Sequence, residues 1–166
     1  MQIRFLVALF ISVLVLQASD KPNVIYILAD DLGYGDLSHA GGKAATPHCD
    51  RLAREGMRFT DSHTTSSVCT PTRYGILTGR YNWRSTLKKS VLWGMSEPLI
   101  ESKRLTVPGF LQKQGYHTAV VGKWHLGLGW QLLPNGEKRK PKTGAQRGDG
   151  WQIDYDKKVT GGPLAV

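Results

Sequence analysis

A continuous run of apolar residues, 23–29, ends at two adjacent carboxylates, Asp30 and Asp31. A run that does not alternate between apolar and polar residues is typical of a parallel strand that is covered on both faces. Such a strand restricts the chain to folds in which helices lie on both sides of a sheet. The two aspartates would follow the carboxyl end of the strand, where open α/β sheets place their binding sites.

The rest of the chain continues this alternation of strands and helices. Threonine or proline at the start and glycine just beyond the end are typical helix boundaries, and they recur along the sequence. The order of elements predicts an α/β fold with an open, mostly parallel sheet and helices on both faces, which looks incomplete at its C-terminal end. The expected elements after the first strand are a helix from Pro47 that Gly56 closes, a strand at 57–60, a helix near Pro71 that ends at Gly79, a helix at 107–114 and a strand at 116–121.

The segment 69–80 (CTPTRYGILTGR) places a thiol and an arginine at the start of one of these helices. Pro71 suits the first helical turn, because its missing N–H has no intrahelical partner there. Cys69 would therefore lie at the positive end of the helix dipole, with Arg73 one turn further along the same face. Such a corner attracts anions, so the pattern predicts an anion-handling site.

A second polar pair, Lys123 and His125, follows the expected strand at 116–121. Two residues apart on an extended segment, their side chains would project to the same side. An ammonium group and an imidazole together can hold an anion and move protons during its release. Because strand ends meet at one edge of an open α/β sheet, we expect Asp30, Cys69 and His125 to converge on one crevice.

These segments resemble three motifs of the sulfatase family. Residues 69–80 match the family's cysteine motif at the cysteine, the proline, the arginine and the closing Thr-Gly-Arg, with Thr72 where serine is usual. Asp-Asp followed by Gly-Tyr-Gly-Asp at 30–36, and Gly-Lys-Trp-His-Leu-Gly at 122–127, are similar to two further sulfatase blocks. The resemblance runs from about residue 21 to residue 166 and implies a sulfatase or alkaline-phosphatase-like fold.

The resemblance implies a nucleophile and a metal. A maturation enzyme of the formylglycine-generating kind would oxidise Cys69 to formylglycine, whose hydrate would attack the sulfur of a sulfate ester. Asp30 and Asp31 would bind calcium together with the hydrate at position 69. Oxygen ligands alone also favour a hard cation, Ca²⁺ or Mg²⁺, over zinc or copper.

The resemblance also assigns the remaining charged groups of the site. Arg73 and Lys123 would contact the sulfate, and His125 would orient or deprotonate the hydrate, while Trp124 would point into the core. The activity implied is hydrolysis of an aryl or carbohydrate sulfate ester, in a small molecule or a polysaccharide.

Other residues of the family's site are expected further along the sequence. In sulfatases an Asp-Asn pair completes the calcium site, and another histidine and lysine follow far downstream; these 166 residues hold no counterpart. We therefore interpret 20–166 as the amino-terminal part of a sulfatase catalytic domain, truncated and poorly active by itself. The alternatives are an inactive fragment or non-catalytic binder of acidic polysaccharide, and a phosphoester hydrolase of the alkaline-phosphatase superfamily.

Residues 1–19 have the features of an export signal. Arg4 precedes a short apolar run at 5–16, and Ala18 and Ser19 provide small residues for cleavage. The run is too short for a stable membrane span, although a retained amphipathic anchor is the alternative. We expect the protein to be exported to the periplasm, the medium or a lumen.

The net charge of +9 suits an acidic substrate. Basic residues are mostly dispersed, and no helix-turn-helix, zinc-finger or aromatic RNA-binding motif accompanies them, so we expect no nucleic-acid partner. An exported chain with two cysteines, Cys49 and Cys69, permits a disulfide, which would exclude formylglycine at Cys69. We favour modification of Cys69, with Cys49 a free thiol packed against the core on a short helix that also turns Leu52 inward.

Overall fold

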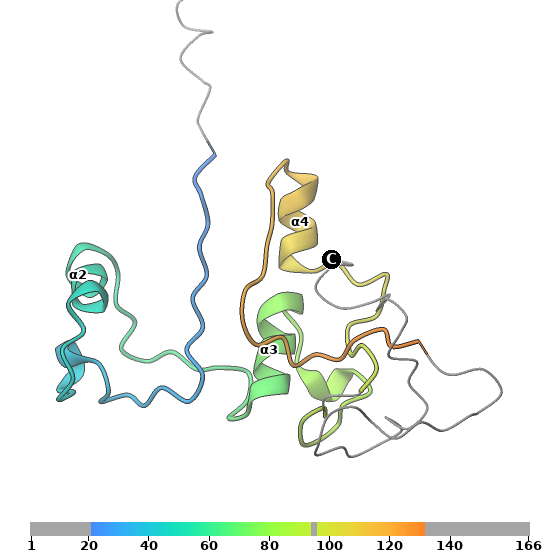
Figure 1. Cartoon of the computed structure of the whole chain (residues 1–166), viewed down its shortest axis with the longest axis horizontal. Helices are drawn as coiled ribbons and strands as arrows, with labels where there is room; N and C mark the ends of the chain where they lie inside the picture. Colours follow the sequence, from blue (N-terminus) through green and yellow to red (C-terminus); the bar gives the residue numbers. More distant parts are fainter. Residues whose placement is uncertain (1–20, 94–95, 132–166) are drawn as a thin grey trace, which may run out of the picture. The chain divides into compact units, whose positions relative to one another are not determined.

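The computed structural model describes residues 21–93 and 96–131, so the expected signal at 1–19 and the residues beyond 131 lie outside the described part. The chain forms two compact units, one up to Leu52 and the other from Ala53. No described helix is long and apolar enough to cross a bilayer. The elements, in chain order, are η2 (Ser38–Ala40), α2 (Pro47–Glu55), α3 (Cys69–Thr78), η3 (Asn82–Arg84) and α4 (Val107–Lys113) (Figure 1).

The three α-helices occur where the sequence indicates, and all but the start of α3 lie within one residue of the expected boundaries. α2 begins at Pro47, and α4 begins after Thr106, whose side-chain oxygen accepts a 3.2 Å hydrogen bond from the amide of Gly109. Gly79 ends α3 in the left-handed conformation, with φ of 63°, and its amide donates to Gly75 O. α3 begins at Cys69, two residues before the proline from which we expected it to start.

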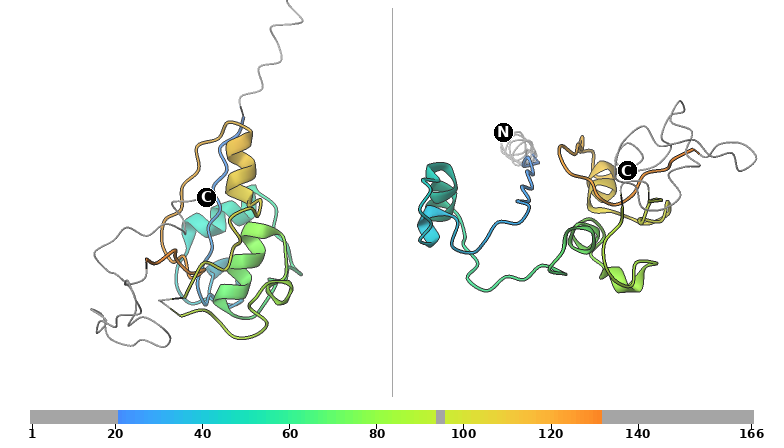
Figure 2. Two further views of the ribbon diagram at one scale, coloured as in Figure 1. Left: turned by 90° about the vertical axis from the view of Figure 1, so that its right-hand side faces the viewer. Right: turned by 60° about the horizontal axis from the view of Figure 1, so that its bottom comes forward.

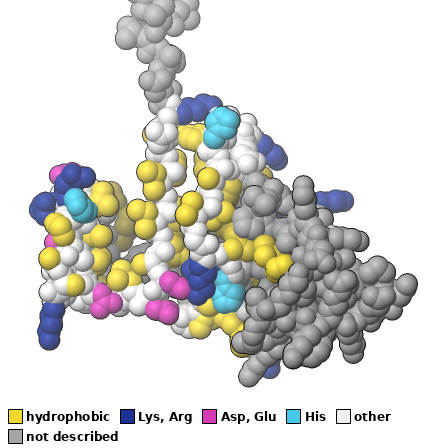
Figure 3. All heavy atoms as spheres, in the orientation of Figure 1, with side chains coloured by type: hydrophobic (Ala, Val, Ile, Leu, Met, Phe, Trp, Pro, Cys, Tyr) yellow, Lys and Arg dark blue, Asp and Glu magenta, His cyan; other side chains and the backbone are white. Residues whose placement is uncertain are grey.

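The described residues contain no strand, so the expected sheet stays a prediction. Residues 23–29, 57–60 and 116–121 are without regular structure. Ile25 is 83% exposed and Val121 is 97% exposed. A strand needs a hydrogen-bonded neighbour, and none is assigned to these runs within the described ranges. Figure 3 shows hydrophobic side chains lying open on the surface of the described residues.

A carboxylate organises the first unit. Asp50, on α2, accepts a 2.6 Å hydrogen bond from the hydroxyl of Ser38 and a 3.1 Å bond from the amide of His39, both on η2. The hydroxyl of Thr46 donates to the same carboxylate at 3.1 Å. The hydrogen bond from Ser38, with those from His39 and Thr46, lowers the pKa of Asp50 from 3.8 to about 2.

Two expectations for α2 are wrong. Leu52 is 63% exposed, and Cys49 is an exposed free thiol rather than a core residue. The reason is that the described part of the first unit has no buried hydrophobic residue against which the helix can pack. The polar network around Asp50 supplies the contacts instead.

The second unit has a small apolar core. Tyr74, Leu99 and Leu126 are buried, at 0%, 5% and 1% exposure. The amide of Leu99 donates to Leu126 O at 2.9 Å, which fixes the core segments to each other. α3 contacts both α4 and η3, and the views in Figures 1 and 2 show the chain returning from α4 to α3. Partly buried residues surround the core: Leu77, Leu87, Leu92, Ile100 and, as the sequence indicated, Trp124.

Tyr74 gives the first test of this core. Its hydroxyl is buried without a hydrogen-bond partner among the described residues. Tyr74→Ala should lower the free energy of unfolding by about 3–5 kcal/mol because it removes a fully buried ring. Tyr74→Phe, which keeps the ring and removes only the unsatisfied hydroxyl, should be neutral or stabilising. Urea unfolding of both variants measures the difference, and equal losses would contradict this description of the core.

The Asp50 network gives a pH-dependent test. The pKa of Asp50 is lower in the folded unit than its ordinary value of 3.8, so its stabilisation is present above that pH and is lost as the pH falls towards 2. Asp50→Asn should therefore lower the hydrogen-exchange protection of the His39 amide at pH 5 and change it little at pH 2. Similar effects at the two pH values would contradict the role given to the carboxylate.

Candidate active site

Cys69 lies at the first position of α3. Val68 precedes it in an extended conformation and provides no side-chain cap for the helix. The amides of the first turn are consequently not occupied by a capping side chain, as an anion-binding helix start requires. Cys69 itself is partly exposed and is a free thiol.

Thr70, the next residue, joins three segments of the second unit. Its side chain is completely buried, and its hydroxyl donates a 3.0 Å hydrogen bond to His125 O. The same oxygen accepts a 3.2 Å hydrogen bond from the amide of Leu92. The carbonyl oxygen of Leu92 lies 2.8 Å from Nε2 of His125. These three contacts form a closed set, which we call the Thr70 triangle.

His125 has a conformation that the sequence did not predict. Its φ is 55°, so the segment is not extended and the expected alternation of side chains does not apply here. Two contacts of the Thr70 triangle, one to its backbone and one to its ring, hold it in this less common conformation. Because Leu92 O can only accept, Nε2 carries the proton in the neutral ring and Nδ1 carries the lone pair. Nδ1 is buried and has no hydrogen-bond partner among the described residues.

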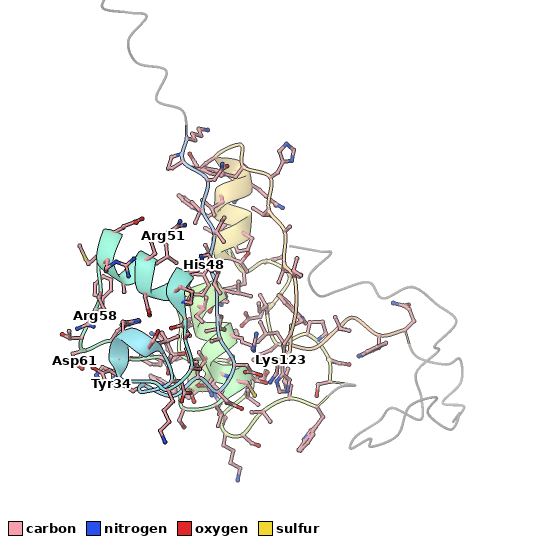
Figure 4. The ribbon with its side chains drawn as sticks, turned by 60° about the vertical axis from the view of Figure 1, so that its left-hand side comes forward. Tyr34, His48, Arg51, Arg58, Asp61 and Lys123 are labelled. Atoms are coloured by element: carbon pink, nitrogen blue, oxygen red, sulfur yellow. The ribbon has the colours of Figure 1, made fainter. Side chains whose placement is uncertain are left out.

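Arg73 connects α3 to Lys123, two residues before His125. Its Nη1 donates a 2.6 Å hydrogen bond to Lys123 O. Arg73 is partly exposed, and Lys123 is exposed on the segment that passes α3 (Figure 4). The first two turns of α3 are thus bonded to residues 123–125 at two places, so the segments that carry four of the expected site residues lie side by side.

Thr72, the departure from the usual motif, uses its hydroxyl within the structure. The hydroxyl donates a 2.8 Å hydrogen bond to Ser66 O, and the residue is only 8% exposed. The preceding loop also lies close to α3 at Gly75, where an added Cβ would collide with Thr65. Thr72 therefore ties the loop before Cys69 to the helix, and its extra methyl group is accommodated.

Asp30 and Asp31 belong to the first unit, whereas the other four site residues belong to the second. Both aspartates are exposed, and Asp31 has a φ of 60°. The turn after them is closed by Asp36, whose carboxylate accepts a 2.6 Å hydrogen bond from the amide of Gly33. No cluster of three or more His, Cys, Asp or Glu side chains suited to a metal occurs in the part of the chain that the structure describes. The assignment of Asp30 and Asp31 as metal ligands stays a prediction.

Sequence reasoning missed the Thr70 triangle. Thr70 lies between Cys69 and the proline, and nothing in its neighbourhood in the sequence indicates a contact with His125, 55 positions away. The carbonyl of Leu92, which fixes the histidine tautomer, carries no side-chain signal at all. Only the tertiary structure brings these groups together.

Comparison with known proteins points in one direction. The family model described as Sulfatase matches residues 22–144. An N-acetylgalactosamine-6-O-sulfatase of Bacteroides thetaiotaomicron is 53% identical over 114 residues, which cover 68% of this chain and 22% of the relative. Arylsulfatase A of Bos taurus is 42% identical over 142 residues, or 85% of this chain and 27% of the relative.

A solved structure agrees with these relatives. Its title concerns glycosaminoglycan metabolism by Bacteroides thetaiotaomicron; it is 49% identical, with a TM-score of 0.63, over 73% of this chain and 24% of that chain. The chain thus spans about a quarter of the length of these relatives.

The Thr70 triangle can be tested by two matched substitutions. Thr70→Val removes the hydroxyl at nearly constant volume and should lower the free energy of unfolding by about 1–3 kcal/mol, because the Leu92 amide and the His125 carbonyl lose their partner. Thr70→Ser retains the hydroxyl and should cost less. The NMR signals of the His125 ring should shift in the valine variant alone. Identical stability and spectra for the two variants would disprove the triangle's role.

Proposed function

Because the chain belongs to the sulfatase family, we propose that it hydrolyses sulfate esters, with Cys69 as the precursor of the nucleophile. One observation carries the proposal: the N-terminal half of α3, which begins with Cys69, is hydrogen-bonded to residues 123–125 through Thr70 and Arg73. The residues that would supply the thiol, the two cations and the imidazole therefore lie on directly bonded segments of the second unit.

The nucleophile is formed from Cys69 by oxidation to formylglycine, for which the protein needs a maturation enzyme as a partner. Partial exposure leaves the side chain accessible to substrate. In the hydrated aldehyde, one hydroxyl attacks the sulfur and the alcohol of the ester departs. The second hydroxyl then loses its proton, the aldehyde re-forms, and sulfate is expelled. A thiol cannot collapse in this way, which is the chemical reason for the modification.

Arg73 and Lys123 stabilise the negative charge that develops on the sulfate oxygens. The bond from Arg73 to Lys123 O uses one of the five N–H donors of the guanidinium. This bond orients Arg73 before substrate binds, so little reorganisation is needed during the reaction. The amide groups at the start of α3 add a further positive contribution.

His125 acts as the base in the collapse of the hydrate. The contact of Nε2 with Leu92 O favours the tautomer in which Nδ1 has a lone pair. Nδ1 is buried and has no hydrogen-bond partner within the described residues, so no described group competes for its lone pair.

A hard divalent cation, Ca²⁺ or Mg²⁺, suits the remaining acidic residues. Asp30 and Asp31 are exposed carboxylates that offer only oxygen atoms. They would hold the cation together with an oxygen from the modified residue at position 69. When bound, the cation would offset the negative charge of the sulfate group.

The substrate class follows from the relatives. The N-acetylgalactosamine-6-O-sulfatase is 53% identical over its matched part, so a carbohydrate sulfate is the substrate we favour. An exported location, after cleavage near Ala18 and Ser19, would bring the protein to such polymers. An aryl sulfate is a convenient assay substrate for the same chemistry.

Steady-state kinetics test the proposal with the chain co-produced with a formylglycine-generating enzyme. The protein should hydrolyse an aryl sulfate, slowly because the chain by itself is expected to be poorly active, and Cys69→Ala should abolish turnover. His125→Ala should lower kcat by about 10²–10⁴-fold, the usual contribution of a general base. Cys49→Ala is the matched control: it removes the exposed thiol of α2 and should leave kcat and KM unchanged.

The matched aryl phosphate distinguishes the alternative phosphoester hydrolase. A preference for phosphate over sulfate would contradict the proposal, and so would turnover that survives Cys69→Ala. Absence of hydrolysis by a wild-type protein whose Cys69 is converted would also contradict it.

A further inference from the structure

Tyr81 and Trp83 form a stacked aromatic pair on the surface of the second unit. Their ring centroids lie 5.5 Å apart with an interplanar angle of 16°, and the residues are 49% and 55% exposed. Aromatic side chains of this size are usually largely buried, and exposed ones with a polar edge are enriched where proteins bind partners. A flat, exposed ring face also suits the C–H face of a sugar. We call this pair the aromatic platform.

Hydrogen bonds inside the turn hold the aromatic platform in place. The side-chain amide of Asn82 donates to Leu87 O at 2.9 Å, and the hydroxyl of Ser85 donates to Asn82 O at 2.5 Å. Asn82 and Ser85 are each only 8% exposed. The rings are therefore presented by a preformed turn, which reduces the entropy lost when a ligand binds.

The sequence segment that carries the aromatic platform has charged residues of one sign only. Residues 62–96 contain five Lys and Arg residues and no Asp or Glu. The ammonium group of Lys88 donates a 2.9 Å hydrogen bond to Trp83 O, which places a cation at the backbone of the platform. Two more exposed cations, Arg84 and Lys89, lie in the same segment.

Arg80, by contrast, is engaged elsewhere. It forms an ion pair with Glu101 at 3.5 Å, and the same carboxylate is 3.1 Å from Arg104. The cations that remain for an external anion are therefore those that follow the aromatic platform in the sequence, at positions 84, 88 and 89.

The aromatic platform lies beyond the C-terminal end of α3, the helix that begins at Cys69. α3 has 10 residues, begins at Cys69 and ends before Tyr81, so its length separates the two sites by about 15 Å. A single sugar cannot contact both. A ligand that engages the platform while its sulfate reacts at Cys69 must be a chain of several sugar units.

We propose that Tyr81 and Trp83, with Lys88 beside them, form a second binding site that holds a sulfated polysaccharide at a distance from Cys69. The rings stack on sugar faces, and the cations contact sulfate groups of the same chain. The identity of the polymer rests on the proposed function; the aromatic and basic character of the surface does not. The site raises the affinity for polymeric substrate and leaves the turnover of small sulfate esters unchanged.

Binding of chondroitin sulfate chains to the full protein tests this site, measured by calorimetry at two salt concentrations. Trp83→Ala should weaken binding by about tenfold, as for an anchoring aromatic residue. Lys88→Gln should weaken binding less and reduce its salt dependence. Both variants should hydrolyse an aryl sulfate at the wild-type rate.

Two controls on α4 match these changes. Phe110→Ala removes another half-exposed aromatic ring, and Lys113→Gln removes another exposed lysine, and neither should alter polymer binding. Unchanged binding by both Trp83→Ala and Lys88→Gln, or equal losses in the α4 variants, would overturn the inference. Equal affinity for chemically desulfated chains or for single-stranded RNA would also overturn it.

The proposed function and this site fail in different ways. If the wild-type protein does not hydrolyse an aryl sulfate but binds the polymer through the aromatic platform, the proposed function is wrong and the proposed binding site stands. If the protein hydrolyses the aryl sulfate but the platform variants bind the polymer as well as the wild type does, the proposed binding site is wrong and the proposed function stands.

Discussion

The hydroxyl of Thr70 is the contact on which the candidate site depends. Thr70 is completely buried, and its hydroxyl donates to His125 O and accepts from the amide of Leu92. It bonds the loop that carries Leu92 and the segment that carries His125 to the start of α3. The residue beside Cys69 thus holds the backbone of His125, the proposed base, and also the Leu92 segment whose carbonyl oxygen contacts the His125 ring.

The same corner shows how one helix can serve two purposes. Its start presents Cys69 and unoccupied cap positions, while its end, at Gly79, leads into the turn that displays the aromatic platform. Tyr74 on the inner face anchors the helix in the core. A rigid helix therefore sets the spacing between the proposed chemistry and the proposed polymer site, and loops need only present the side chains.

Helices were predictable from the sequence because their signals are local. Thr106 before α4 and Gly79 after α3 act on backbone groups within one or two turns, and both do so in the structure. The expected strands depend on neighbours that are distant in sequence, and residues 23–29 have no such neighbour in the described part of the chain. The conformation of His125 was missed for a related reason: tertiary hydrogen bonds, rather than its own preference, hold its φ at 55°.

The chemical state of Cys69 tests the account most directly. Mass spectrometry of the peptide that contains it, from protein co-produced with a formylglycine-generating enzyme, should show oxygen in place of sulfur and two hydrogens, and this peptide should react with a hydrazide probe. Cys49 should remain a thiol in the same sample. An unmodified Cys69, or a disulfide between Cys69 and Cys49, would contradict the proposed nucleophile and the mechanism built on it.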